Sequence, residues 1–245
     1  MTILLTERGD GPVLTLTLNR PAAANALDSA LQDALVVALA GAAADSGVRA
    51  MVLAAAGGRV FSAGADLKEW SELPPAAAAT RRRAALLRTL RAVLDFPKPL
   101  VVALSGKAIG AGAMLAVLAD RVVAAGSASL SMPEIRLGTP SPIGIAVLTP
   151  RGGRDAAFRL VQAGATLDAQ DARALGLVDI VTDRGAVAML SRQQAHDLAQ
   201  FCGPAFSANK AWMAKDMAAR LDAAAAEAQR FQDTLRAAVE QADGH

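Results

Sequence analysis

Hydrophobic and polar residues follow two different periods along this chain, and each period predicts one kind of element. Residues 13–18 (Val-Leu-Thr-Leu-Thr-Leu) alternate apolar and polar side chains, which indicates a half-buried strand. Over about residues 28–44 leucine recurs at every fourth position, which predicts a helix with one buried face. The leucines of this stripe are Leu27, Leu31, Leu35 and Leu39. We expect Asn25 to cap the start of that helix.

Strands and helices continue to alternate through the rest of the sequence. Apolar runs predict strands at 48–55, 100–104, 121–125 and 176–181, and a short strand at the start of 129–138. Helical patterns cover about 80–95, 112–120, 154–162 and 169–175, and nearly everything from residue 186 onward apart from a break at Gly203-Pro204. This alternation favours an α/β fold, with a core over residues 1–185 and a C-terminal helical region over 186–245.

Three segments carry weaker patterns. Residues 74–79 join two prolines to a run of alanines, so we expect a mobile surface segment there. Residues 139–144 (Thr-Pro-Ser-Pro-Ile-Gly) are dense in proline and glycine and are expected to form a loop. The strand end near residues 60–62 runs into small residues, which we expect to lead into a helix near residue 66.

The composition limits the class of protein. A length of 245 residues predicts one large domain, with or without an appendage. Because 53% of the residues are hydrophobic and only 3% are aromatic, the core must be built from closely packed alanine, valine and leucine. Charged residues interrupt each apolar run, which argues against a membrane-spanning segment. The apolar stretch at the start of the chain is too short for a signal peptide, because charged residues appear within the first eight positions. A single cysteine, Cys202, excludes an intramolecular disulfide. We therefore expect a cytoplasmic protein.

The charge gives no reason to expect a nucleic-acid partner, because the net formal charge is only +2. Basic residues gather in one place, at Arg81, Arg82, Arg83, Arg88 and Arg91, with no aromatic residue between them. This cluster can be a solvated helix face or a site for an anionic ligand, and the sequence leaves both interpretations open.

Several common active-site motifs are absent. Residues 110–115 begin like a dinucleotide-binding fingerprint, but Leu115 stands in the place of the third glycine. The Gly-Lys pair at 106–107 lacks the following serine or threonine of a P-loop. Both histidines, His196 and His245, fall in the helical tail, which argues against a Ser-His-Asp hydrolase and against a metal site.

Two turns of similar composition remain, one around Ala65 and one around Ala111. Each follows a strand, and the second opens the apolar helix expected over 112–120. Small residues leave backbone N–H groups accessible, and such groups at the start of a helix attract a phosphate or an oxyanion. Two donors from separate turns suit a carbonyl oxygen that becomes an enolate.

Several segments together resemble the crotonase, or enoyl-CoA hydratase/isomerase, superfamily. They are residues 62–68 (Ser-Ala-Gly-Ala-Asp-Leu-Lys), 106–116, 133–138 (Pro-Glu-Ile-Arg-Leu-Gly) and 176–178 (Gly-Leu-Val), with Asn19-Arg20-Pro21 and Asn25-Ala26-Leu27 matching the N-terminal motif. The resemblance spans roughly residues 10–215. It implies a crotonase-like spiral of ββα units whose helical region assembles a homotrimer or a dimer of trimers. It also implies an acyl-CoA thioester as the ligand, with coenzyme A as part of the substrate and no separate cofactor.

The resemblance further implies roles for individual residues. The backbone N–H groups of Ala65 and Ala111 would form an oxyanion hole, while Glu134 and Met114 occupy the positions of catalytic side chains. The residues implied along the coenzyme A path are Ala22, Ala24, Ala26, Ala63, Asp66 and Leu67, with Lys68 near a phosphate. The residues implied around the thioester are Gly110, Ala111 and Gly112.

One departure from the family pattern bears on the reaction. Family hydratases carry two glutamates, whereas this chain has Glu134 at one position and Met114 at the other. Hydration needs a positioned water, which two carboxylates hold well, but moving a double bond needs only one group that removes and returns a proton. We therefore favour isomerisation of an enoyl-CoA by a single glutamate. Hydration of reduced or altered chemistry and non-catalytic acyl-CoA binding are the alternatives.

Overall fold

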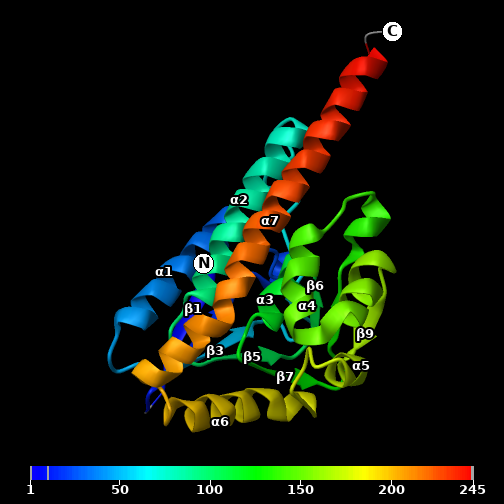
Figure 1. Ribbon diagram of the computed structural model, residues 1–245. Coiled ribbons are helices and arrows are strands. Elements are labelled where there is room, and N and C mark those ends of the chain that lie inside the picture. The colour runs from blue at the N-terminus through cyan, green and yellow to red at the C-terminus, as the bar shows by residue number, and fades with distance from the viewer. Residues whose placement is uncertain (1, 10, 244–245) are drawn as a thin grey trace.

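The structure is a computed structural model that describes residues 2–9 and 11–243. Three consecutive ββα units organise it (Figure 1). In each unit the first strand joins a six-stranded sheet, the second joins a four-stranded sheet, and a helix follows. The units are β3 (Ala50–Ala55), β4 (Val60–Ser62) and α2 (Pro75–Leu94); β5 (Leu100–Leu104), β6 (Lys107–Ile109) and α3 (Ala111–Val117); and β7 (Arg121–Ala125), β8 (Ser129–Ser131) and α4 (Pro142–Ala157). The expected α/β class and the spiral of ββα units are confirmed.

The large sheet forms the centre of the core. Its order is β1-β2-β3-β5-β7-β10, where β1 spans Leu4–Arg8, β2 Val13–Leu18 and β10 Ile180–Thr182. Every neighbouring pair is parallel except β1 with β2. All five residues of β5 are buried, as expected for a parallel strand covered on both faces, whereas β2 alternates buried and half-buried positions. Helix α6 (Val187–Ala199) packs against this sheet.

The small sheet carries the turns that the sequence singles out. Its order is β4-β6-β8-β9, with β9 (Thr166–Asp168) antiparallel to β8 and the other pairs parallel. Strand β6 lies between the strand expected at 100–104 and the turn expected around Ala111, where no strand was predicted. Because β4 and β6 are neighbours, the backbones that leave them continue side by side, and they enter the turns around residues 65 and 111.

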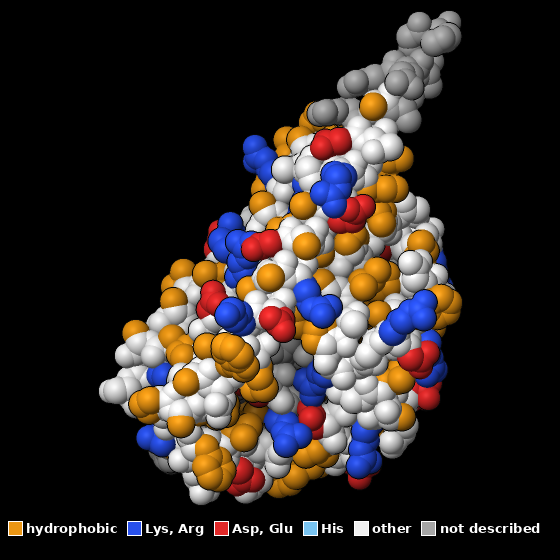
Figure 2. Space-filling view, viewed as in Figure 1, with side chains coloured by type: hydrophobic (Ala, Val, Ile, Leu, Met, Phe, Trp, Pro, Cys, Tyr) orange, Lys and Arg blue, Asp and Glu red, His pale blue; other side chains and the backbone are white. Residues whose placement is uncertain are grey.

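The remaining helices cover the two sheets. They are α1 (Ser29–Ala44), α5 (Ala169–Ala174) and α7 (Pro204–Asp243), with 3₁₀ turns at Pro21–Ala23, Pro133–Leu137 and Arg184–Ala186 and a π-helical turn at Phe158–Gln162. Helix α7 starts at the expected break, packs against α2 and α4, and extends beyond the body of the molecule (Figure 1). On the face shown in Figure 2, basic and acidic side chains are interspersed, with no broad area of one sign. No described helix combines the length and apolar character needed to cross a bilayer.

A buried ion pair fixes α7 to the central strand and helix. The Lys210 Nζ atom donates to Asp120 Oδ2 at 2.6 Å and to the Lys98 carbonyl at 3.0 Å. The same Asp120 oxygen accepts from the Leu100 N–H at 2.8 Å. Lys210 is only 7% exposed, and burial lowers the pKa of its ammonium group while Asp120 opposes that effect. Both charged groups have hydrogen-bond partners, so neither buried charge is left unpaired. The contact therefore holds α7 against the central strand.

Some local predictions were wrong, and proline explains two of them. Residues 74–79 are not a mobile segment, because α2 begins at Pro75, and the loop expected at 139–144 is replaced from Pro142 onward by α4. Proline suits the first turn of a helix, where no intrahelical N–H is needed. Residues 66–73 form bends and turns rather than a helix.

The cap of α1 was also predicted wrongly. Asp28, not Asn25, caps this helix, since the Asp28 side chain accepts from the Leu31 N–H at 2.8 Å. Asn25 is fully buried and lies in the left-handed region with φ of 51°. Its side-chain oxygen accepts from the Arg20 N–H at 2.9 Å, and its amide nitrogen donates to the carbonyls of Ala56 and Val60, both at 3.0 Å. Asn25 therefore joins the segment after β2 to the connection between β3 and β4.

Replacing Asn25 should expose how much this loop depends on it. Asn25→Ala leaves the Arg20 N–H and two carbonyls without partners and places alanine at a positive φ, so we expect the free energy of unfolding to fall by about 3 kcal/mol. Denaturant titration measures this. Asn19→Ala is the matched control, because the Asn19 side chain makes one bond, to the Thr2 carbonyl at 2.7 Å. If the free energy of unfolding falls as little for Asn25→Ala as for Asn19→Ala, Asn25 does not hold this loop as we infer.

Candidate active site

The turns around Ala65 and Ala111 lie against each other. A Cβ atom built on Gly64 would come within 2.7 Å of the Ile109 carbonyl oxygen and 3.3 Å of the Ala111 nitrogen. A Cβ atom on Gly112 would lie 2.6 Å from the Ser62 carbonyl oxygen. These distances require glycine at both positions, and Gly64 also has φ of 85°. The close approach therefore depends on backbone atoms alone.

The Ala65 N–H is directed away from its neighbouring segment. Leu27 donates to the Gly64 carbonyl at 2.8 Å and accepts from the Asp66 N–H at 3.2 Å, so residues 64 and 66 supply the bonds of this parallel bridge. Backbone polar groups alternate in direction along an extended segment, which turns the N–H of Ala65 to the opposite side. Among the described residues this N–H has no hydrogen-bond acceptor.

The Ala111 N–H is free for a different reason. Ala111 is the first residue of α3, and the first N–H groups of a helix have no acceptor within the helix. Gly110 precedes it with φ of 52° and donates its own N–H to the Ser131 carbonyl at 2.8 Å. All seven residues of α3 are buried, so the turn is held firmly against the core.

Glu134 places a carboxyl group beside this second turn. It lies on the 3₁₀ turn Pro133–Leu137, and its Oε1 atom is 2.8 Å from the position that a Cβ of Gly110 would occupy. Its Oε2 atom is buried and has no hydrogen-bond partner among the described residues. Burial raises the pKa of Glu134 above the ordinary 4.5, while a backbone hydrogen bond within the residue acts in the opposite direction. A buried carboxyl oxygen without a partner is costly in a purely structural position, which makes Glu134 a candidate functional group.

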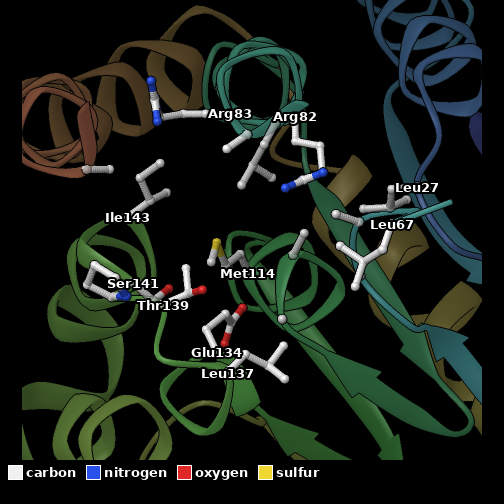
Figure 3. A pocket seen from close by; sticks show the side chains of 18 of the residues that line it. Leu27, Leu67, Arg82, Arg83, Met114, Glu134, Leu137, Thr139, Ser141 and Ile143 are labelled. Atoms are coloured by element: carbon white, nitrogen blue, oxygen red, sulfur yellow. The ribbon is translucent and has the colours of Figure 1, made fainter. Parts of the chain in front are cut away.

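A cavity of about 310 Å³ joins the two turns and Glu134 (Figure 3). Helices α2, α3, α4 and α7 all contribute to its wall, and most lining side chains are apolar. Met114 is 3% exposed and points into the cavity near Glu134. The side chain at this position is therefore a thioether that neither donates nor accepts a strong hydrogen bond.

The structure brings together part of the predicted set of site residues. Those that line the cavity are Ala63, Ala65, Leu67, Gly110, Ala111, Met114 and Glu134. Those that lie outside its lining are Ala22, Ala24, Ala26, Asp66, Lys68 and Gly112. Asp66 accepts from Arg20, and Gly112 faces Ser62, so both have structural contacts of their own. The predicted roles of the outer residues toward coenzyme A stay predictions.

Sequence reasoning missed several lining residues. Thr139 and Ser141 bring hydroxyl groups into the wall, Arg82 brings a guanidinium from α2, and Phe231 comes from α7. The Thr139–Ser141 segment follows Glu134 closely in the chain, which is a signal that could have placed it at the site. Phe231 carries no such signal, because only the packing of α7 across the cavity brings it there.

Comparison with known proteins identifies the family to which the chain is similar. The family model described as "Enoyl-CoA hydratase/isomerase" matches residues 8–244. The chain is 39% identical to the 2,3-dehydroadipyl-CoA hydratase of Escherichia coli, over 93% of this chain and 88% of that protein. It is 34% identical to the cyclohexa-1,5-dienecarbonyl-CoA hydratase of Thauera aromatica, over 74% and 68% of the two chains. The crystal structure of enoyl-CoA hydratase from Mycobacterium smegmatis superposes with a TM-score of 0.82 at 31% identity, covering 96% of this chain and 91% of that one.

The raised pKa of Glu134 leads to a pH-dependent effect on stability. The fold disfavours the ionised carboxylate, so this residue destabilises the protein increasingly as pH rises through its folded-state pKa, and not below 4.5. Glu134→Gln should therefore raise the melting temperature near neutral pH, and the gain should vanish in acid. Calorimetry across this pH range measures the effect, with the exposed Glu72→Gln as the matched control. If Glu134→Gln raises the melting temperature equally at every pH, the raised pKa of Glu134 is not the cause.

Proposed function

The chain belongs to the enoyl-CoA hydratase/isomerase family, and from this premise we propose that it isomerises the double bond of an enoyl-CoA thioester. The thioester oxygen lies between the N–H groups of Ala65 and Ala111, and Glu134 transfers the proton. The observation that carries the proposal is one carboxyl group with a buried, unpartnered oxygen beside two unpaired backbone donors in a mostly apolar cavity.

The chemistry follows from these three groups. Two N–H donors stabilise negative charge on the thioester oxygen, and losing one such donor costs about 3–4 kcal/mol in other enzymes. A carbon next to the double bond can then lose a proton to the Glu134 carboxylate, because the electrons left behind delocalise onto that oxygen. The protonated Glu134 returns the proton to a different carbon of the same chain. The double bond has moved and the enzyme is unchanged, so no water is consumed.

Met114 supports isomerisation over hydration. Its buried thioether provides no carboxylate to orient a water molecule opposite Glu134. Apolar surroundings also help to keep the pKa of Glu134 raised, which brings it nearer to the pKa suited to both accepting and donating a proton at neutral pH.

Hydration is the second candidate, and specific observations favour it. The relatives named above are hydratases, and the hydroxyl-bearing residues Thr139 and Ser141 line the cavity on the side of Glu134 (Figure 3). Hydroxyl groups can hold a water molecule by hydrogen bonds where a second carboxylate is missing. In this scheme Glu134 takes a proton from the water as its oxygen bonds to the acyl chain, and then protonates the neighbouring carbon.

A panel of 2-enoyl- and 3-enoyl-CoA substrates, assayed for both reactions, tests the proposal. We expect interconversion of the double-bond positions to exceed hydration. Glu134→Gln keeps the size and polarity of the side chain but removes the proton acceptor, so turnover should fall about 10²–10⁴-fold while acyl-CoA binding changes little. Unchanged turnover in Glu134→Gln would make the residue structural, and hydration as the main reaction would select the second candidate.

We also propose a homotrimer or a dimer of trimers, in the cytoplasm. Several large apolar residues of the C-terminal helical region are exposed. The exposed fraction is 71% for Phe201, 74% for Trp212 and 72% for Met213. Association would bury them, as is usual for apolar groups on the surfaces of subunits. Analytical ultracentrifugation at micromolar concentration should give a trimer or hexamer, and Trp212→Asp should weaken it. A monomeric wild-type protein would contradict the proposal.

A further inference from the structure

The three consecutive arginines of α2 have different surroundings. Successive residues of an α-helix point about 100° apart, so they cannot share one partner surface. Arg81 lies over the ring of Trp70, 5.3 Å from its centroid. Arg83 points toward α7, where its guanidinium donates to Gln232 at 2.5 Å and to Gln229 (Figure 3). Arg82 points into the cavity instead.

Arg82 is the cation of the lining that has no protein partner. Among the described residues no hydrogen bond, ion pair or ring contact of Arg82 occurs. The one carboxylate of the lining, Glu134, lies across the cavity from it (Figure 3). A half-buried guanidinium amid mostly apolar walls binds a carboxylate more strongly than one in open water, and its planar donors fit both carboxylate oxygens.

We propose that Arg82 binds a carboxylate at the far end of the acyl group, so that the preferred substrates are enoyl-CoA thioesters of dicarboxylic acids. This inference rests on the proposed function for the position of the thioester. With the thioester oxygen at the two turns, the carbons that react face Glu134, and the rest of the acyl chain continues along the cavity past Met114 toward α2. Arg82 lies on that side (Figure 3).

The phosphates of coenzyme A are the other possible source of negative charge. Of the residues predicted along the coenzyme A path, Ala63 and Leu67 line the cavity with Arg82, whereas Ala22, Ala24, Ala26, Asp66 and Lys68 lie outside its lining. The position of Arg82 alone therefore does not separate the two sources. A phosphate contact would strengthen the binding of every acyl-CoA equally. A carboxylate contact strengthens only those substrates whose acyl chain ends in a carboxylate, and this difference makes the two sources separable.

Matched substrates test the proposal. We would compare 2-enoyl-CoA thioesters of equal chain length that end in a methyl group or in a carboxylate, and measure kcat/KM for each. The wild-type protein should prefer the carboxylate. Arg82→Met should lower kcat/KM about 10–100-fold for the carboxylate-ended substrate and less than about twofold for the methyl-ended one. Arg81→Met, which alters an exposed neighbour outside the cavity lining, should leave the ratio unchanged.

The remaining outcomes overturn one claim or the other. Equal losses for both substrates in Arg82→Met would assign the residue to coenzyme A, and no loss for either would leave it without a ligand role; both results overturn the inference. If the wild-type protein turns over neither substrate, the proposed function fails. The inference is then tested by calorimetric binding of the saturated methyl-ended and carboxylate-ended acyl-CoA thioesters to the wild-type protein and Arg82→Met. A preference for the carboxylate that Arg82→Met removes would support it, and equal affinities would overturn it.

Discussion

The close approach of two backbone turns is the constraint on which the site depends. Gly64 and Gly112 leave no room for a side chain, because an added Cβ would collide with Ile109 in one case and with Ser62 in the other. Strands β4 and β6 hold the turns at this distance by pairing directly before them. Since the donors are backbone groups, the arrangement is preorganised by the sheet and needs no side chain to move into place.

Burying Glu134 at this site lowers the stability of the fold. A carboxyl group with a buried, unpartnered oxygen opposes folding whenever it is ionised, and the backbone hydrogen bond within the residue offsets this cost only in part. The same burial raises its pKa and so makes one group a better proton acceptor and donor in turn. Asn25 represents the opposite case, since its buried amide is bonded at both ends and stabilises the loop that pairs with the first turn.

Much of the site was predictable because its residues lie close to sharp sequence signals. Glycine before Ala65 and around Ala111, and the Pro-Glu pair at residue 134, mark positions where backbone or carboxyl groups must be reached. The ends of helices were less predictable, since proline can either break a helix or begin one, as Pro75 and Pro142 do. The cavity walls from α2 and α7 depend on tertiary packing, so neither Phe231 nor the separate surroundings of three adjacent arginines could be read from the sequence.

The central claim is that one thioester oxygen is bound by the N–H groups of Ala65 and Ala111 while Glu134 faces the acyl carbons. A crystal structure of the complex with a saturated acyl-CoA thioester, which cannot isomerise or be hydrated, tests it directly. We predict that the thioester oxygen lies within hydrogen-bond distance, about 3 Å, of both nitrogens. A thioester oxygen outside the two turns, or an acyl chain directed away from Glu134, would contradict the account.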